Sequence, residues 1–216
     1  MKYNGFYFQL FRGTMKKVLI ERYGQDFAQD TMKKARNLYK KLVLDADDIG
    51  AGNPMAYNEL FALAFVAPYI VSGKRIVPEI VQEMMRRSLY RVKFYFSMVD
   101  LNTPQGKLSN QKSILKYVKW YTPERERRYP NSFKVDFVGK PYEEACYYRI
   151  TRCPICAYCK MLGVEELMPL LCELDKVMIG FQHGVLHREQ TIASGGGCCD
   201  YFITGDREQL KPEDKN

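Results

Sequence analysis

The stretch Phe133-Lys134-Val135-Asp136-Phe137 decides the fold, because the hydrophobic pattern of the chain changes there. Upstream of it, apolar residues recur at every third or fourth position, as they do in amphipathic helices. Within it, apolar and charged residues alternate, as they do in a strand that buries one face. The sequence therefore predicts an α+β fold, with a helical part first and a small sheet after it.

The part before this change, residues 1–121, is predicted to be helical. Asn53 is expected to cap the second helix and Pro54 to occupy its first turn, where a missing N–H group costs nothing. Pro78 opens the third helix in the same way. The expected helices cover residues 28–43, 53–65, 78 to about 102, and 114–118. The charged segment 122–131, bounded by prolines, is predicted to be a linker.

The part after the change, residues 132–206, is predicted to run strand, strand, helix and hairpin. The expected strands are 133–137, 145–152, 185–193 and 199–204, and the expected helix ends near Gly180. The cysteine-rich segment 153–159 is predicted to be a turn, and the glycines at 195–197 to reverse the hairpin. Residues 207–216 read as a polar tail. We expect residues 1–216 to form one domain, a helical layer packed on an antiparallel sheet with a helix and a C-terminal β-hairpin.

Composition excludes several classes of protein. The chain has 216 residues, of which 46% are hydrophobic and 27% charged, so it is neither disordered nor a coiled coil. The longest charge-free stretch, residues 60–73, has 14 residues and is shorter than the roughly 20 that a membrane-spanning helix needs. The N-terminus lacks the pattern of a signal peptide. We therefore predict a cytoplasmic protein that does not act at a membrane.

The net charge of +8 raises the question of a nucleic-acid partner. Basic residues do gather at 86–93 and 125–128, but acidic residues dilute both runs and no nucleic-acid motif accompanies them. We predict solvated surface there and no nucleic-acid binding. A small anionic substrate suits the same charge balance.

Seven cysteines indicate thiols or metal ligands, because an odd number with two adjacent members does not suit a disulfide framework. Cys153, Cys156 and Cys159 have the spacing with which a tight turn grips zinc, yet no second pair follows. A run of this kind is more often a set of free thiols than a metal site, so we predict free thiols here. His183 and His187 lie in an extended segment, about 13 Å apart, which is too far to share a metal ion.

Cys172 and Asp175 are three residues apart on the predicted helix, so their side chains point the same way. A small buried cysteine beside an exposed aspartate is the alternative interpretation. We expect Cys172 to meet Cys199, because the helix and the hairpin after it must pack together to bury Leu171 and Ile203.

The order of these features resembles the L-2-amino-thiazoline-4-carboxylic acid hydrolase family. The resemblance rests on Arg188, on Thr191-Ile192-Ala193 before the glycines, and on Cys199-Asp200 before an aromatic pair. Cys172 with Asp175, and Thr151-Arg152-Cys153 at a strand end, precede them in the same order. The resemblance covers the last third of the chain by motif and the helical half by layout.

The resemblance implies hydrolysis of a small cyclic amidine, with N-carbamoyl-L-cysteine as the product. A cysteine thiolate is a competent nucleophile, and an aspartate can hold the amidine and orient water. The candidate catalytic residues are Cys153, Cys172, Asp175, Cys199 and Asp200. Arginine binds carboxylates bidentately, so the substrate-binding candidates are Arg152 and Arg188, with Thr191 adding a hydrogen bond.

Several questions stay open at this point. The cofactor is unknown: zinc or manganese, or none, and any zinc is expected to use Cys153 with Cys172 or Cys199. The roles of Cys156, Cys159, Cys198, His183 and His187, and the oligomeric state, are not assigned. The alternative function is a non-enzymatic small-molecule or metal-binding sensor domain, since the layout also resembles vinyl-reductase-like ligand-binding domains.

Overall fold

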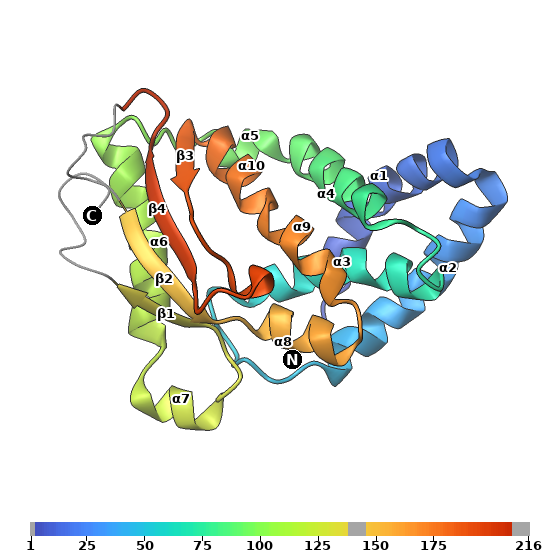
Figure 1. Cartoon of the computed structure of the whole chain (residues 1–216), viewed down its shortest axis with the longest axis horizontal. Helices are drawn as coiled ribbons and strands as arrows, with labels where there is room; N and C mark the ends of the chain where they lie inside the picture. Colours follow the sequence, from blue (N-terminus) through green and yellow to red (C-terminus); the bar gives the residue numbers. More distant parts are fainter. Residues whose placement is uncertain (1–2, 138–145, 209–216) are drawn as a thin grey trace.

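The computed structural model describes residues 3–137 and 146–208, and it confirms the α+β fold (Figure 1). Four helices build the first part of the chain: α1 (Phe6–Tyr23), α2 (Gln25–Asp45), α3 (Ala56–Val71) and α4 (Pro78–Arg91). Helix α1 is additional to the helices that the sequence predicts. Helix α3 is central, because Ala62 to Tyr69 are all buried and α1, α2 and α4 all contact it. A helix that is apolar on every side has to be covered on every side.

The predicted third helix is shorter than expected. It breaks at Val92, where the backbone leaves helical geometry, and a short helix α5 (Lys93–Phe96) follows. Helix α6 (Pro104–Trp120) then begins at Thr103, whose side chain accepts the Gly106 N–H. The cap predicted at Asn53 is also wrong in position. Asn53 accepts the Met55 N–H and donates to Ser132, and α3 begins only at Ala56.

Two segments predicted to be irregular are helical. The predicted linker contains α7 (Pro123–Arg128), because the Thr122 hydroxyl accepts the Arg125 N–H and Pro123 fits the first turn. The predicted turn at 153–159 is part of α8 (Pro154–Met161), which also opens on a proline. The cysteines of this run therefore lie on or beside a helix and not in a metal-gripping turn.

The predicted helix that ends near Gly180 is divided into three pieces. They are a 3-10 turn η1 (Glu165–Leu167), α9 (Met168–Cys172) and α10 (Leu174–Phe181). The break falls at Glu173, between Cys172 and Asp175. The two residues of the predicted pair therefore belong to different helices.

The sheet has the strand order β1-β2-β4-β3, and every pairing is antiparallel. The strands are β1 (Lys134–Phe137), β2 (Cys146–Arg152), β3 (Gly184–His187) and β4 (Cys199–Gly205). Strand β3 ends six residues earlier than predicted, because both Asp200 carboxylate oxygens accept backbone N–H groups of residues 189 and 190 and turn the chain away. A 3-10 turn, η2 (Ile192–Ser194), completes the connection to β4.

One face of the sheet is apolar and looks toward the helices. Tyr148 and Ile150 of β2 lie beside Tyr201 and Cys199 of β4, and all four are buried. Two hydrophobic clusters result, one within the helices and one on this sheet face, and Ile155 packs against both. The single domain stays a prediction, and residues 209–216 of the predicted tail lie outside the described residues. No helix among the described residues is long and apolar enough to cross a membrane.

A buried carboxyl group in α3 makes the stability of the fold depend on pH. Glu59 is 1% exposed and its Oε2 has no hydrogen-bond partner. Burial raises the pKa of Glu59 to about 7, so the folded state holds a proton that the unfolded state loses above its ordinary pKa of about 4.3. Stability contributed by this proton is therefore lost as the pH rises from about 4.3 to about 7.

We expect Glu59→Gln to stabilise the protein at pH 8 by about 3 kcal/mol, because the amide needs no proton, and to have little effect at pH 4.5. Urea unfolding at both pH values measures this difference. Glu79→Gln, at an exposed position of α4, is the control and should show no such pH dependence. An equal effect of Glu59→Gln at both pH values would contradict the assignment.

Candidate functional site

A cavity of about 480 Å³ lies between the apolar face of the sheet, α3, and helices α9 and α10. The predicted residues Cys153, Cys172, Asp175 and Cys199 all line it. Cys172 and Cys199 thus both border this cavity, and their direct meeting stays a prediction. The four residues come from the end of β2, from α9, from α10 and from β4; Figure 1 shows β2 beside β4, and α9 leading into α10.

An ion pair between Asp175, which borders the cavity, and Arg188 behind it supports this wall. Arg188 Nη1 donates to Asp175 Oδ2 at 2.8 Å, and its Nη2 donates to the Cys172 carbonyl oxygen at 2.6 Å. The Tyr201 hydroxyl donates to the same Oδ2 at 2.7 Å. Arg188 therefore holds α9 and α10 together across their break, and Tyr201 ties them to the sheet.

The two carboxylate oxygens of Asp175 are not equivalent. Both hydrogen bonds go to Oδ2, and among the described residues no donor reaches Oδ1. The side chain is 25% exposed, and it borders the cavity. Burial raises the pKa of Asp175, while the Tyr201 hydroxyl and Arg188 act in the opposite direction. One carboxylate oxygen thus faces the cavity as an available hydrogen-bond acceptor.

Arg188 itself does not reach the cavity. Its side chain is only 2% exposed, and Glu173 lies 3.7 Å from Nη2 in addition to Asp175. Its guanidinium also lies over the Tyr201 ring, with 5.5 Å between its Cζ and the ring centroid. The predicted carboxylate-binding residue instead neutralises and positions Asp175.

An aromatic pair supports the same group from the sheet. Tyr201 stacks on Tyr148 with 4.7 Å between ring centroids and 9° between ring planes. Burial, followed by the Asp175 charge, raises the pKa of Tyr201 well above its ordinary value, so its hydroxyl keeps the proton that it donates. Tyr57 of α3, which is about half exposed, borders the same cavity.

The thiols that line the cavity are held in the neutral form. Burial raises the pKa of Cys199 to about 11, although the Ile192 N–H donates to its sulfur at 3.2 Å. Burial and the Asp175 charge raise the pKa of Cys172 still further. A hydrogen bond with Cys156, together with burial, raises the pKa of Cys153 well above its ordinary value. In the free protein these side chains are thiols and not preformed thiolate nucleophiles.

Three other predicted site residues have local structural partners and do not border the cavity. Asp200 accepts the backbone N–H groups of Glu189 and Gln190. The Thr191 hydroxyl accepts the Ser194 N–H and caps η2. Arg152 donates to the Ser132 carbonyl oxygen at 2.7 Å and to the Tyr121 hydroxyl. Each of them shapes the loops around the site.

The residues whose roles were open lie elsewhere. His187 contacts Thr204, with 2.9 Å between its Nε2 and the hydroxyl, on the sheet face opposite Tyr201, and His183 lies 3.6 Å from Asp206. Cys159 is fully buried in the helical core, where burial raises its pKa to about 12. Cys198 is buried directly before β4, and Cys156 packs beside the helical core. In the described part of the chain, no group of three or more His, Cys, Asp or Glu residues has the arrangement to hold a metal ion.

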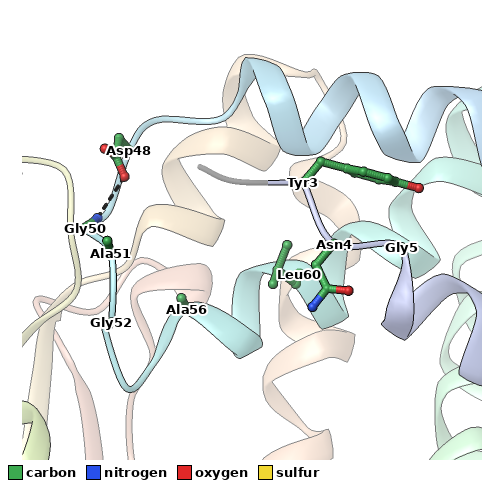
Figure 2. A pocket seen from close by; sticks show the side chains of 9 residues that line it. All are labelled: Tyr3, Asn4, Gly5, Asp48, Gly50, Ala51, Gly52, Ala56 and Leu60. Carbon is green, nitrogen blue, oxygen red and sulfur yellow. Dashed lines mark hydrogen bonds between the residues drawn. The ribbon is translucent and has the colours of Figure 1, made fainter.

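A second hollow, of about 670 Å³, lies where the N-terminal segment passes the loop between α2 and α3 (Figure 2). Its one ionisable group besides Tyr3 is Asp48, whose Oδ1 accepts the Gly50 N–H. The other lining side chains drawn in Figure 2 are Asn4, small residues and Leu60. This hollow offers no nucleophile and no acid–base pair among the described residues. The cavity with Asp175 is therefore the candidate active site.

Sequence comparison now adds to this geometry. A comparison with protein-family models matches residues 57–203 to the L-2-amino-thiazoline-4-carboxylic acid hydrolase family. The chain belongs to this family. The matched region contains every predicted site residue of the hydrolase and begins at Tyr57, which borders the cavity from α3. Comparisons with curated proteins and with solved structures gave no match.

Sequence reasoning missed the contribution of the helical part to the site. Tyr57 and Asn58 at the start of α3, and Asn110, Ser113 and Lys116 on α6, also border the cavity. On α6 these positions recur at intervals of three, which is the spacing of one helix face. The sequence therefore contained a signal for a site on this helix, namely a polar face next to the apolar Ile114 and Tyr117.

We expect Arg188→Met to destabilise the protein by about 3 kcal/mol, because it leaves the Asp175 carboxylate without its cation. Adding Asp175→Asn should recover part of this loss, since the unpaired charge is then gone. Urea unfolding of the single and double variants measures both effects. Arg87→Met, which removes an exposed arginine with two glutamate partners, is the control and should cost much less.

We expect alkylation of Cys199 by iodoacetamide to accelerate with pH up to about 11, because only the thiolate reacts. Mass spectrometry of the alkylated peptides gives the rate at each pH. A short cysteine peptide with both ends blocked, whose thiol has the ordinary pKa of about 8.5, is the reference. A rate for Cys199 that reaches a plateau near pH 8 would show an activated thiolate instead.

Proposed function

We propose that this protein hydrolyses a small cyclic amidine of the thiazoline type and opens the ring at its carbon–sulfur bond. The observation that carries the proposal is the asymmetry of Asp175, which borders the cavity: Arg188 and Tyr201 fix its Oδ2, while no donor from the described part of the chain reaches its Oδ1. A fixed carboxylate beside a mostly apolar cavity suits an amidinium group, which presents N–H donors and a positive charge. The family to which the chain belongs carries the name of such a hydrolase.

The proposed reaction uses water as the nucleophile. Water adds to C2 of the thiazoline, between sulfur and nitrogen, and Asp175 Oδ1 accepts a proton from it. The C2–S bond of the tetrahedral adduct then breaks. Because the ring nitrogen of the bound amidinium already carries its proton, Asp175 passes the proton that it took from water to the departing sulfur. The second water proton leaves to solvent, and the water oxygen becomes the carbonyl oxygen of a urea. From L-2-amino-thiazoline-4-carboxylate, the product is N-carbamoyl-L-cysteine.

The electrostatics of the site support this division of roles. A carboxyl group whose pKa is raised by burial is a stronger base than an ordinary aspartate. The neighbouring thiols of Cys172 and Cys199 have raised pKa values, which favours water over a thiolate as the attacking group. Arg188 and Tyr201 are positioning residues, because each acts through Asp175. The six described cysteines are free, which fits the reducing cytoplasm where we propose that the protein acts.

The direct test is turnover. Incubation with L-2-amino-thiazoline-4-carboxylate should release a free thiol, which a colorimetric thiol reagent detects after the protein is removed. We expect Asp175→Asn to lower kcat/KM at least about a hundredfold, because it removes the base and the amidinium partner together. Asp30→Asn, which makes the same change at an exposed position of α2 that does not border the cavity, is the matched control and should retain activity.

Two outcomes would contradict the proposal. One is full activity of Asp175→Asn, which would place the chemistry elsewhere. The other is the absence of thiol release from the wild-type protein, with and without added zinc or manganese. Binding of the thiazoline without turnover would favour the sensor function instead.

A further inference from the structure

The cavity is larger than a single thiazoline ring requires. Its volume of about 480 Å³ lies in the range of pockets that enclose ligands of drug size, roughly 300–1,000 Å³. Most of its wall is apolar, with side chains such as Met85, Phe61 and Met178 from three helices. An aminothiazoline carboxylate is a small polar ion and leaves this apolar wall without a partner.

The charges of the cavity wall are placed at two separate points. Among the described residues that line the cavity, Asp175 is the acid and Lys116 is the base. Lys116 lies on the polar face of α6, is exposed, and forms no ion pair within the described part of the chain. Arg188, the other cation near the site, is paired with Asp175 and does not border the cavity.

The fold keeps these two charges apart. Helix α6 contacts β2, whereas α10, which carries Asp175, contacts β3. Tyr201 of β4 holds the Asp175 carboxylate, and β4 lies between β2 and β3 in the sheet. Figure 1 shows α6 next to β1 and β2, with α10 next to β3. The amidine and carboxylate of a single thiazoline ring are only a few bonds apart, whereas the cavity wall runs from Asp175 on α10 past α3 and the sheet to Lys116 on α6.

We propose that the site takes an elongated substrate, in which a cyclic amidine is joined through an apolar segment to an anionic group. The amidinium end pairs with Asp175, the apolar segment lies along the sheet face and α3, and the anionic end pairs with Lys116. This inference rests on the proposed hydrolase function and specifies its substrate class. It makes Lys116 a specificity-determining residue that takes no part in the chemistry.

Binding of stable amidines tests this without turnover. The probes are para-amidinophenylbutanoate, its uncharged butanamide, and the shorter para-amidinobenzoate, titrated calorimetrically into the full chain. We expect the butanoate to bind about fivefold more tightly than either of the other two, because it alone reaches Lys116 with a negative charge. The advantage should shrink at high salt, since Lys116 is exposed.

Variants on α6 separate this effect from a general change of the pocket. Lys116→Ala should remove the fivefold advantage of the butanoate and leave the affinity for the butanamide unchanged. Lys119→Ala removes an exposed lysine of the same helix that does not border the cavity, and it should change neither affinity. Asp175→Asn should weaken all three probes.

The outcomes distinguish this inference from the hydrolase proposal. Equal affinities of butanoate and butanamide for the wild-type protein, or equal losses of both in Lys116→Ala, overturn the elongated substrate. So does an affinity for the benzoate that matches that for the butanoate. If the probes behave as expected but no thiazoline releases a thiol, the hydrolase proposal fails while the binding site with two charged ends stands.

Discussion

The ion pair between Arg188 and Asp175 is the interaction on which the site depends. It is formed by the loop after β3, and it meets the junction of α9 and α10 at the point where the helix breaks. Without Arg188, the Asp175 carboxylate would lie unpaired in an apolar wall, which costs free energy of folding. The end of α9 and the start of α10 would also lose the side chain that bonds to both. Tyr201 then connects this arrangement to the sheet. The pair thus fixes one carboxylate oxygen, while the other has no donor among the residues that the structure describes, and the proposed hydrolysis uses that asymmetry.

Sequence patterns predicted much of the fold because the hydrophobic period is a property of the chain alone. The change of period at Phe133 located the sheet, and the apolar stripes located α2, α3, α4 and α6. The errors have specific causes. Asp200 ended β3 early by capturing two backbone N–H groups from residues eleven and ten positions earlier, a contact that no local pattern shows. Pro123 was taken as the boundary of a linker and the cysteine-rich run 153–159 as a turn, but Pro123 and Pro154 each begin a helix.

The sequence also located part of the candidate site, through the type and order of its residues. Cys172, Asp175 and Cys199 were found from residue type and order, and they do share a cavity. The role of Arg188 depends on its burial, which residue type does not reveal. Its side chain is enclosed and pairs with Asp175, so it does not face a substrate. Tyr57 and Lys116 lie far from the cysteines in the sequence, and only the packing of α3 and α6 over the sheet brings them to the cavity. Thiol reactivity likewise followed from the buried surroundings and not from the presence of cysteine.

The central position of α3 makes it depend on helices that lie outside the region matched to the family. The family match begins at Tyr57, one residue after the start of α3, and leaves α1 and α2 outside it. Yet Ala62 to Tyr69 are buried on all sides, partly by these two helices. A chain reduced to the matched region would expose a broad apolar surface and would be prone to aggregate. Helices α1 and α2 therefore serve as a cover that keeps the apolar surface of α3 away from solvent.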